Sequence, residues 1–178
     1  MPISGELHTL SQEERSQEIN IRDHFRDVMI NQKRMDLHKR YLKEKIDVPY
    51  NEDKLSIVVQ NVDGTIPIFV ERKESDERTI SAYVYETKTL IDNIDISKQM
   101  KPIHVSLLED ELTIQFPNQS TYNFAQFRNE FTITQFTNNL YFHRDIEFAA
   151  QLVYLQIPRD IEILSDDNMT ELIFVNER

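Results

Sequence analysis

Hydrophobic residues recur at helical spacing in the first quarter of the chain. Ser11 and Glu14 fit the capping box with which many helices begin. No Gly or Pro interrupts the following stretch before Pro49. This pattern predicts a long helix over residues 11–47, which either breaks near Asn31 or projects from the rest of the molecule.

One face of the predicted helix carries a seam whose positions follow each other at steps of four and three, the spacing of a heptad repeat. Two interpretations stay open. Either the helix packs on its own sheet, with Leu37 and Tyr41 widening the stripe, or the seam pairs with another subunit as a coiled coil. In the second case the expected interface residues are Ile21, Phe25, Val28, Met35, Lys39, Arg40, Leu42 and Ile46.

From residue 55 the hydrophobic period falls to two, which is typical of strands. We expect strands at residues 55–60, 65–70, 79–87, 103–108, 112–116, 131–137, 140–142, 161–164 and 170–175. Residues 146–157 fit a central strand or a buried helix, and Pro67 favours an edge strand or a bulge. Short polar loops at residues 61–64, 109–111, 138–139 and 166–168 predict hairpins.

These patterns predict an α+β fold, with a long N-terminal helix followed by a mainly antiparallel β domain that forms a meander, a sandwich or a partial barrel. The chain then divides into an N-terminal arm (1–10), a helical segment (11–47) and an acidic β-rich domain (52–178). The aromatic residues concentrated in 124–148 are expected in the core, or else in an interface patch.

The charge distribution supports this division. The net charge is −11, from 20 Lys or Arg and 31 Asp or Glu. Residues 1–50 hold nine of each kind and are neutral, so residues 51–178 carry the whole excess. Residues 31–45 are locally basic, with six Lys or Arg against Asp36 and Glu44. We therefore do not expect direct binding to nucleic acid or to an anionic membrane.

Composition excludes several kinds of active site. The chain has two Gly, Gly5 and Gly64, and no Cys. A Gly-rich phosphate loop, a dinucleotide fingerprint, a nucleophile elbow and a cysteine metal site all need residues that are missing. The histidines lack metal-ligand spacing, and the carboxylates at 109–111 and 166–167 lack that of an EF-hand. We expect no resident cofactor and no metal.

One short pattern points to a different chemistry. Asp63 precedes the apolar run 66–70, which Glu71 and Lys73 follow. This arrangement resembles the signature of the PD-(D/E)xK nuclease superfamily. The resemblance implies Asp63 and Glu71 as Mg²⁺ ligands and Lys73 as the residue that activates the attacking water. The pattern covers about a dozen residues and lacks the Pro that precedes the aspartate in the family.

The expected function is non-catalytic: a structural or interaction protein within a homo-oligomer or a larger assembly. A component of a phage tail, neck or baseplate fits the composition, which is rich in Ile and Asn. The alternatives are the Mg²⁺-dependent nuclease and an acidic inhibitor that imitates DNA. The N-terminus does not read as a signal peptide, so we expect a cytoplasmic or, for a phage component, a virion location.

Overall fold

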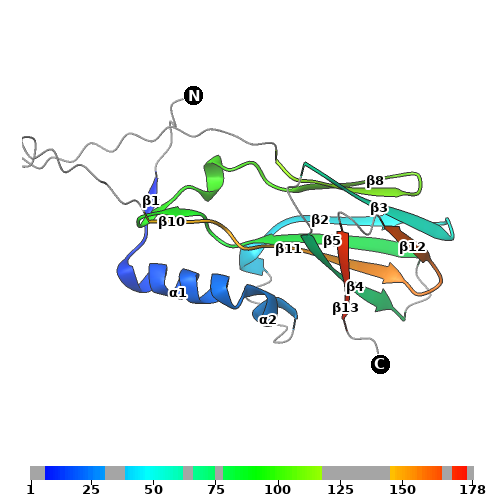
Figure 1. Ribbon diagram of the computed structural model, residues 1–178, viewed down its shortest axis with the longest axis horizontal. Coiled ribbons are helices and arrows are strands. Elements are labelled where there is room, and N and C mark those ends of the chain that lie inside the picture. Colours follow the sequence, from blue (N-terminus) through cyan, green and yellow to red (C-terminus); the bar gives the residue numbers. More distant parts are fainter. Residues whose placement is uncertain are drawn as a thin grey trace, which may run out of the picture.

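The computed structural model describes residues 7–30, 39–61, 66–74, 78–117, 145–165 and 170–175. Of the described residues, 55% lie in strands and 18% are helical, and they form short helices and three sheets, so this part of the chain is mostly β. The expected α+β fold with a long N-terminal helix is therefore wrong. Figure 1 shows two extended sheets facing each other, with helices against the opposite side of one of them.

The central and outer sheets combine parallel and antiparallel pairings, whereas the end sheet is antiparallel. The central sheet has the order β13–β4–β11–β5–β2, with β2 (Leu42–Pro49), β4 (Ile66–Lys73), β5 (Thr79–Glu86), β11 (Gln151–Pro158) and β13 (Thr170–Val175). The outer sheet has the order β12–β3–β9–β8, with β3 (Lys54–Gln60), β8 (His104–Leu108), β9 (Glu111–Gln115) and β12 (Glu162–Ser165). The end sheet has the order β1–β7–β6–β10, with β1 (His8–Thr9), β6 (Leu90–Ile91), β7 (Ile94–Asp95) and β10 (Ile146–Glu147).

The central sheet is buried on both faces along part of its length, which makes the molecule three layers deep there. Alternate residues of β5 and β11, such as Val84 and Leu155, enter the core shared with the outer sheet. The residues between them, such as Tyr85 and Leu152, pack against the helices together with Phe25. Residues 146–157 therefore contain a central strand rather than a buried helix, as one of the two sequence interpretations predicted.

The N-terminal helix begins as predicted but ends early. In α1 (Gln12–Asp23) the Ser11 hydroxyl accepts from the Glu14 amide at 3.2 Å, and the Glu14 carboxylate accepts from the Ser11 amide at 2.8 Å. The helix stops at Asp23, and α2 (Phe25–Ile30) follows it. The capping box is thus confirmed, whereas the continuous helix over 11–47 is not.

The coiled-coil interpretation is wrong because its seam does not lie on one helix. Leu42 and Ile46 belong to β2, where they pair with β5 of the central sheet. Phe25 is buried against that sheet, and Ile21 packs beside it. Val28 lies in α2, and Met35 lies outside the described residues. The remaining interface candidates, Lys39 and Arg40, lie in a helical turn at residues 39–41 that leads into β2.

A bulge in β2 changes the face of the central sheet to which its following side chains point. Leu42 pairs with Tyr85 and Glu44 with Val84, so β2 advances two residues while β5 advances one. The extra residue reverses the side-chain alternation. As a result Leu42 packs on the helix side, whereas Ile46 packs on the side of the outer sheet.

Two of the predicted hairpins are instead crossings between layers. β3 lies in the outer sheet and β4 in the central sheet, and the same holds for β12 and β13. β12 runs parallel to β3, and β13 runs parallel to β4, so the C-terminal strands repeat the path of the earlier pair. Pro67 accordingly lies in an interior strand, at its second residue, one position before the pairing of β4 with β11 begins.

The hairpin formed by β8 and β9 is confirmed. Leu108 pairs with Glu111, which leaves Glu109 and Asp110 as a two-residue loop. Glu109 has a φ of 54°, the sign that the first loop residue of a tight hairpin requires. With so little glycine in the chain, a glutamate takes this position. The expected hairpin at 138–139 lies outside the described residues.

A buried carboxylate fastens α1 to the central sheet. Glu18 is 3% exposed, and its carboxylate accepts hydrogen bonds from the Arg40 guanidinium and, at 3.1 Å, from the Tyr41 hydroxyl. The Lys88 ammonium lies 4.0 Å away. Burial, and then the neighbouring Glu18 carboxylate, raise the pKa of Tyr41.

We expect Glu18→Ala to lower the free energy of unfolding by about 1–3 kcal/mol, because it leaves the buried Tyr41 hydroxyl without its acceptor, whereas the Arg40 side chain is 46% exposed and stays solvated. Urea denaturation followed by circular dichroism measures this change. Gln17→Ala, at an exposed position of the same helix, is the control and should stay within about 0.5 kcal/mol of the parent chain. Equal stability of the two variants would show that the Glu18 contacts do not hold the helix.

Candidate functional site

The pair singled out by the nuclease-like pattern lies on one face of β4. Glu71 and Lys73 are two residues apart, so both side chains point to the helix side of the central sheet, as Phe69 does. Asp63, the first residue of the pattern, lies outside the described residues. The structure therefore describes the surroundings of Glu71 and Lys73 but not those of the first residue of the pattern.

Both side chains are held by neighbouring strands. The Glu71 carboxylate accepts from the Tyr154 hydroxyl at 2.5 Å and from the Gln156 amide at 2.7 Å. The Lys73 ammonium donates to the Thr79 carbonyl oxygen and to the Ser81 hydroxyl, both at 2.8 Å. Within the described part of the chain, no three His, Cys, Asp or Glu side chains are grouped so that they could hold a metal ion.

These contacts belong to a larger surface, which we call the polar face. α1 and α2 lie against one end of the central sheet, and the strands extend well beyond them in Figure 1. Tyr83 and Tyr154 still pack against the cluster that contains Phe25, and beyond them the same side of the sheet becomes polar. The polar face consists of Lys45, Asp47, Glu71, Lys73, Ser81, Tyr83, Tyr154 and Gln156.

Two tyrosines form the middle of the polar face. The rings of Tyr83 and Tyr154 have centroids 6.1 Å apart and are inclined by 52°. The Tyr83 hydroxyl donates to the side-chain oxygen Oε1 of Gln156 at 3.3 Å, and the side-chain nitrogen Nε2 of Gln156 donates in turn to the Glu71 carboxylate. This chain of bonds fixes the positions of both rings relative to β4.

The charged groups of the polar face are also paired. The Lys45 ammonium lies 2.6 Å from the Asp47 carboxylate and 5.5 Å from the centre of the Tyr83 ring. Hydrogen bonds from Lys45 and then from Ser81 lower the pKa of Asp47. Two lysines and two carboxylates make the face neutral overall, in a chain with a net charge of −11.

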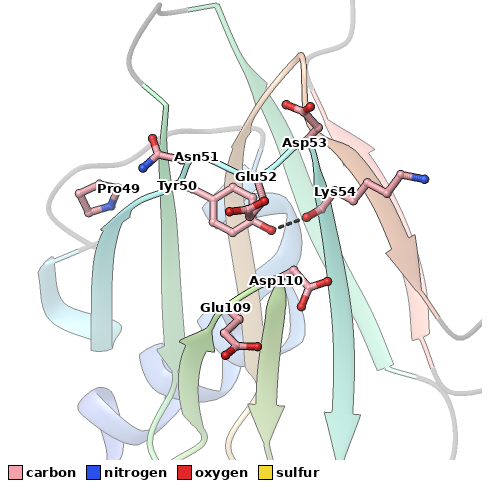
Figure 2. A pocket seen from close by; sticks show the side chains of 8 residues that line it. All are labelled: Pro49, Tyr50, Asn51, Glu52, Asp53, Lys54, Glu109 and Asp110. Carbon is pink, nitrogen blue, oxygen red and sulfur yellow. Dashed lines mark hydrogen bonds between the residues drawn. The ribbon is translucent and has the colours of Figure 1, made fainter.

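A second candidate site is the acidic groove at the end of the sandwich. Its volume is about 760 Å³, and Figure 2 shows its lining residues: Pro49, Tyr50, Asn51, Glu52, Asp53, Lys54, Glu109 and Asp110. Glu52 and Asp53 come from the loop between β2 and β3, whereas Glu109 and Asp110 form the tip of the hairpin. The Tyr50 hydroxyl donates to the Lys54 carbonyl oxygen, as the dashed line in Figure 2 marks.

The groove carboxylates differ in their partners. Asp53 pairs with Arg78 at 3.0 Å, and Lys54 pairs with Glu162 at 3.1 Å, outside the groove lining. For the carboxylates of Glu52, Glu109 and Asp110, the described residues supply no ion-pair partner. Burial, and then the nearby Asp110 and Glu52, raise the pKa of Tyr50.

Several predicted features lie outside the described residues: the carboxylates at 166–167, the basic residues Lys33 and Arg34, and most of the aromatic segment 124–148. Of that segment's aromatic residues, Phe148 is described, and it is 68% exposed. Sequence analysis missed the polar face as a unit. No local pattern joins its residues, because Tyr154 and Gln156 lie on a strand far in the chain from Tyr83 and Glu71.

Comparisons of the chain with protein-family models, with curated proteins and with solved structures found no match. Across the described ranges, no helix combines the length and the apolar character needed to cross a membrane.

The tyrosines of the central sheet should make the protein sensitive to alkali. Burial and then the hydrogen bond to Glu71 raise the pKa of Tyr154, and burial raises that of Tyr85 to about 12. The folded state therefore keeps protons that the unfolded state releases above about pH 10, and stability falls as the pH rises.

We expect Tyr154→Phe to reduce this alkaline slope by up to about 1.4 kcal/mol per pH unit, the contribution of one proton. Urea denaturation between pH 9 and pH 11.5 measures the slope. Tyr50→Phe, at a tyrosine whose hydroxyl donates to a backbone carbonyl oxygen instead of a carboxylate, should change it less. An unaltered slope in Tyr154→Phe would mean that this hydroxyl ionises equally in the folded and unfolded states.

Proposed function

We propose that this chain is a non-catalytic interaction protein that binds a basic segment of a partner protein in its acidic groove. The observation that supports the proposal is the group of three carboxylates, Glu52, Glu109 and Asp110, that have no ion-pair partner among the described residues. A partner's lysines or arginines would supply the missing counter-charges.

An apolar contact beside the groove adds to this argument. Leu108 immediately precedes Glu109 at the hairpin tip and is 77% exposed, the highest value among the large hydrophobic side chains that the structure describes. Each exposed charge pair contributes well under about 1 kcal/mol. The carboxylates would therefore guide the approach of the partner, and apolar contact with Leu108 would supply affinity.

A second copy of this chain is one source of a basic segment. Lys39 and Lys43 are exposed near the start of β2. Arg40, which the sequence also placed in an interface, is instead bound to the buried Glu18. Self-association would require the lysines of one copy to reach the groove of another, and light scattering across a concentration series measures it.

The binding test uses a fluorescent nine-residue oligolysine peptide and fluorescence polarisation at low and at physiological salt. We expect the parent chain to bind the peptide and the affinity to fall as salt rises. The double variant Glu109→Lys/Asp110→Lys should bind at least tenfold more weakly, and Leu108→Ser should weaken binding a few-fold.

The matched control is Glu13→Lys/Glu171→Lys, which changes the net charge equally at exposed positions of α1 and β13. It should retain most of the affinity if the groove is the binding site. Equal losses in both double variants would show that the peptide responds only to total charge, and would overturn the proposal. Absence of binding to the parent chain at low salt would overturn it as well.

A further inference from the structure

The polar face is an unusual surface for the interior strands of a sheet. Interior strands of a sheet usually bury both faces or expose simple polar residues. Here the interior strands β4, β5 and β11 present two partly buried tyrosines within a fixed set of donors and acceptors. Such an arrangement has the components of a binding surface: rigid rings and pre-positioned hydrogen-bonding groups.

The charges of the polar face and of the whole chain restrict the kind of ligand that the face can bind. Lys45 and Lys73 balance Asp47 and Glu71, so the face itself attracts neither cations nor anions strongly. The surrounding chain carries −11 and repels anionic ligands such as nucleic acid. A ligand without net charge fits this surface better than a phosphate-bearing one.

The charged side chains of the polar face need to stay hydrated, which disfavours a protein partner at this surface. The centres of protein interfaces are depleted of Lys and Glu, because burial against apolar side chains removes their water. Glu71 and Lys73 lie close to the two rings of the polar face. A ligand rich in hydroxyl groups replaces the lost water with its own hydrogen bonds, so these charges remain solvated by the ligand.

The tyrosines complete the chemical match. A sugar ring is amphipathic: its C–H groups form an apolar patch, and its hydroxyls lie around the rim. The face of a Tyr ring binds such a patch, while its hydroxyl and neighbouring polar groups bind the rim. Tyr83 and Tyr154 offer two rings 6.1 Å apart, and Gln156 and Glu71 lie beside them.

We propose that the polar face binds a neutral oligosaccharide, laid across β5, β11 and β4 on the rings of Tyr83 and Tyr154. Gln156 and Glu71 hydrogen-bond its hydroxyl groups, and Lys45 borders the platform at the edge strand β2. Because an open face encloses little of the ligand, affinity is in the micromolar to millimolar range, about −8 to −4 kcal/mol.

The test titrates the whole chain with three neutral hexasaccharides, cellohexaose, maltohexaose and chitohexaose, by isothermal calorimetry. Intrinsic fluorescence gives a second readout, since the chain has seven Tyr and no Trp. We expect saturable binding of at least one of them, with a change in Tyr emission. If none of the three binds at millimolar concentration, the proposal is wrong.

Variants locate the binding site. Tyr83→Ala should weaken binding at least tenfold, whereas Tyr83→Phe, which keeps the ring, should weaken it only a few-fold. Phe148→Ala removes an exposed aromatic ring outside the polar face and is the matched control, with affinity unchanged. Equal affinities of Tyr83→Ala and the parent chain, with both folded by circular dichroism, would place any binding elsewhere.

The proposals for the acidic groove and for the polar face can each be disproved without the other. Glu109→Lys/Asp110→Lys should leave hexasaccharide binding intact, because the groove and the polar face share no residue. Tyr83→Ala should likewise leave oligolysine binding intact. Loss of both activities in either variant would show that the two measurements report one site or general unfolding, and would overturn the separate assignment of the polar face.

Discussion

The central sheet has to bury both of its faces at once, and the other layers follow from this requirement. Its interior strands place aliphatic residues such as Val84 and Leu155 on one side and large residues such as Tyr85 and Leu152 on the other. The first side is covered by the outer sheet and the second by α1 and α2. Each residue buried in this way contributes about 1.5–3 kcal/mol, so leaving either side exposed would remove most of the stability of the sheet.

The helices cover only part of the second side, and this incomplete cover creates the polar face. The buried Glu18, bound to Arg40 and Tyr41, determines where α1 lies along the sheet. Beyond that point the strands keep their alternation but carry polar side chains, which bond to each other across β4, β5 and β11. The acidic groove is separate: it forms where loops of the central and outer sheets meet at the end of the sandwich. One fold thus offers a neutral aromatic surface and an anionic one.

Local patterns predicted those elements whose determinants lie close together in the chain. The capping box at Ser11, the strands β3, β5, β8 and β9 and the tight turn at Glu109 are all local. The helix over 11–47 failed for a physical reason: residues four apart, such as Leu42 and Ile46, share a face in a helix and also in a regular strand. Lack of Gly and Pro did not decide between them. Pairing with β5 did, with a bulge that then turned the two side chains to opposite faces.

The sequence by itself determined the periodicity of the strands, the uneven charge, the absence of glycine-rich and cysteine sites, and the candidate pair Glu71 and Lys73. Only the tertiary structure decided which strands are neighbours, because short loops fit a hairpin as well as a crossing between layers. It therefore also decided the chemical surroundings of Glu71, whose bonding partners Tyr154 and Gln156 lie more than 80 residues away in the chain. Neighbours of this kind arise from the parallel pairing of β4 with β11, a long-range contact that no local pattern encodes.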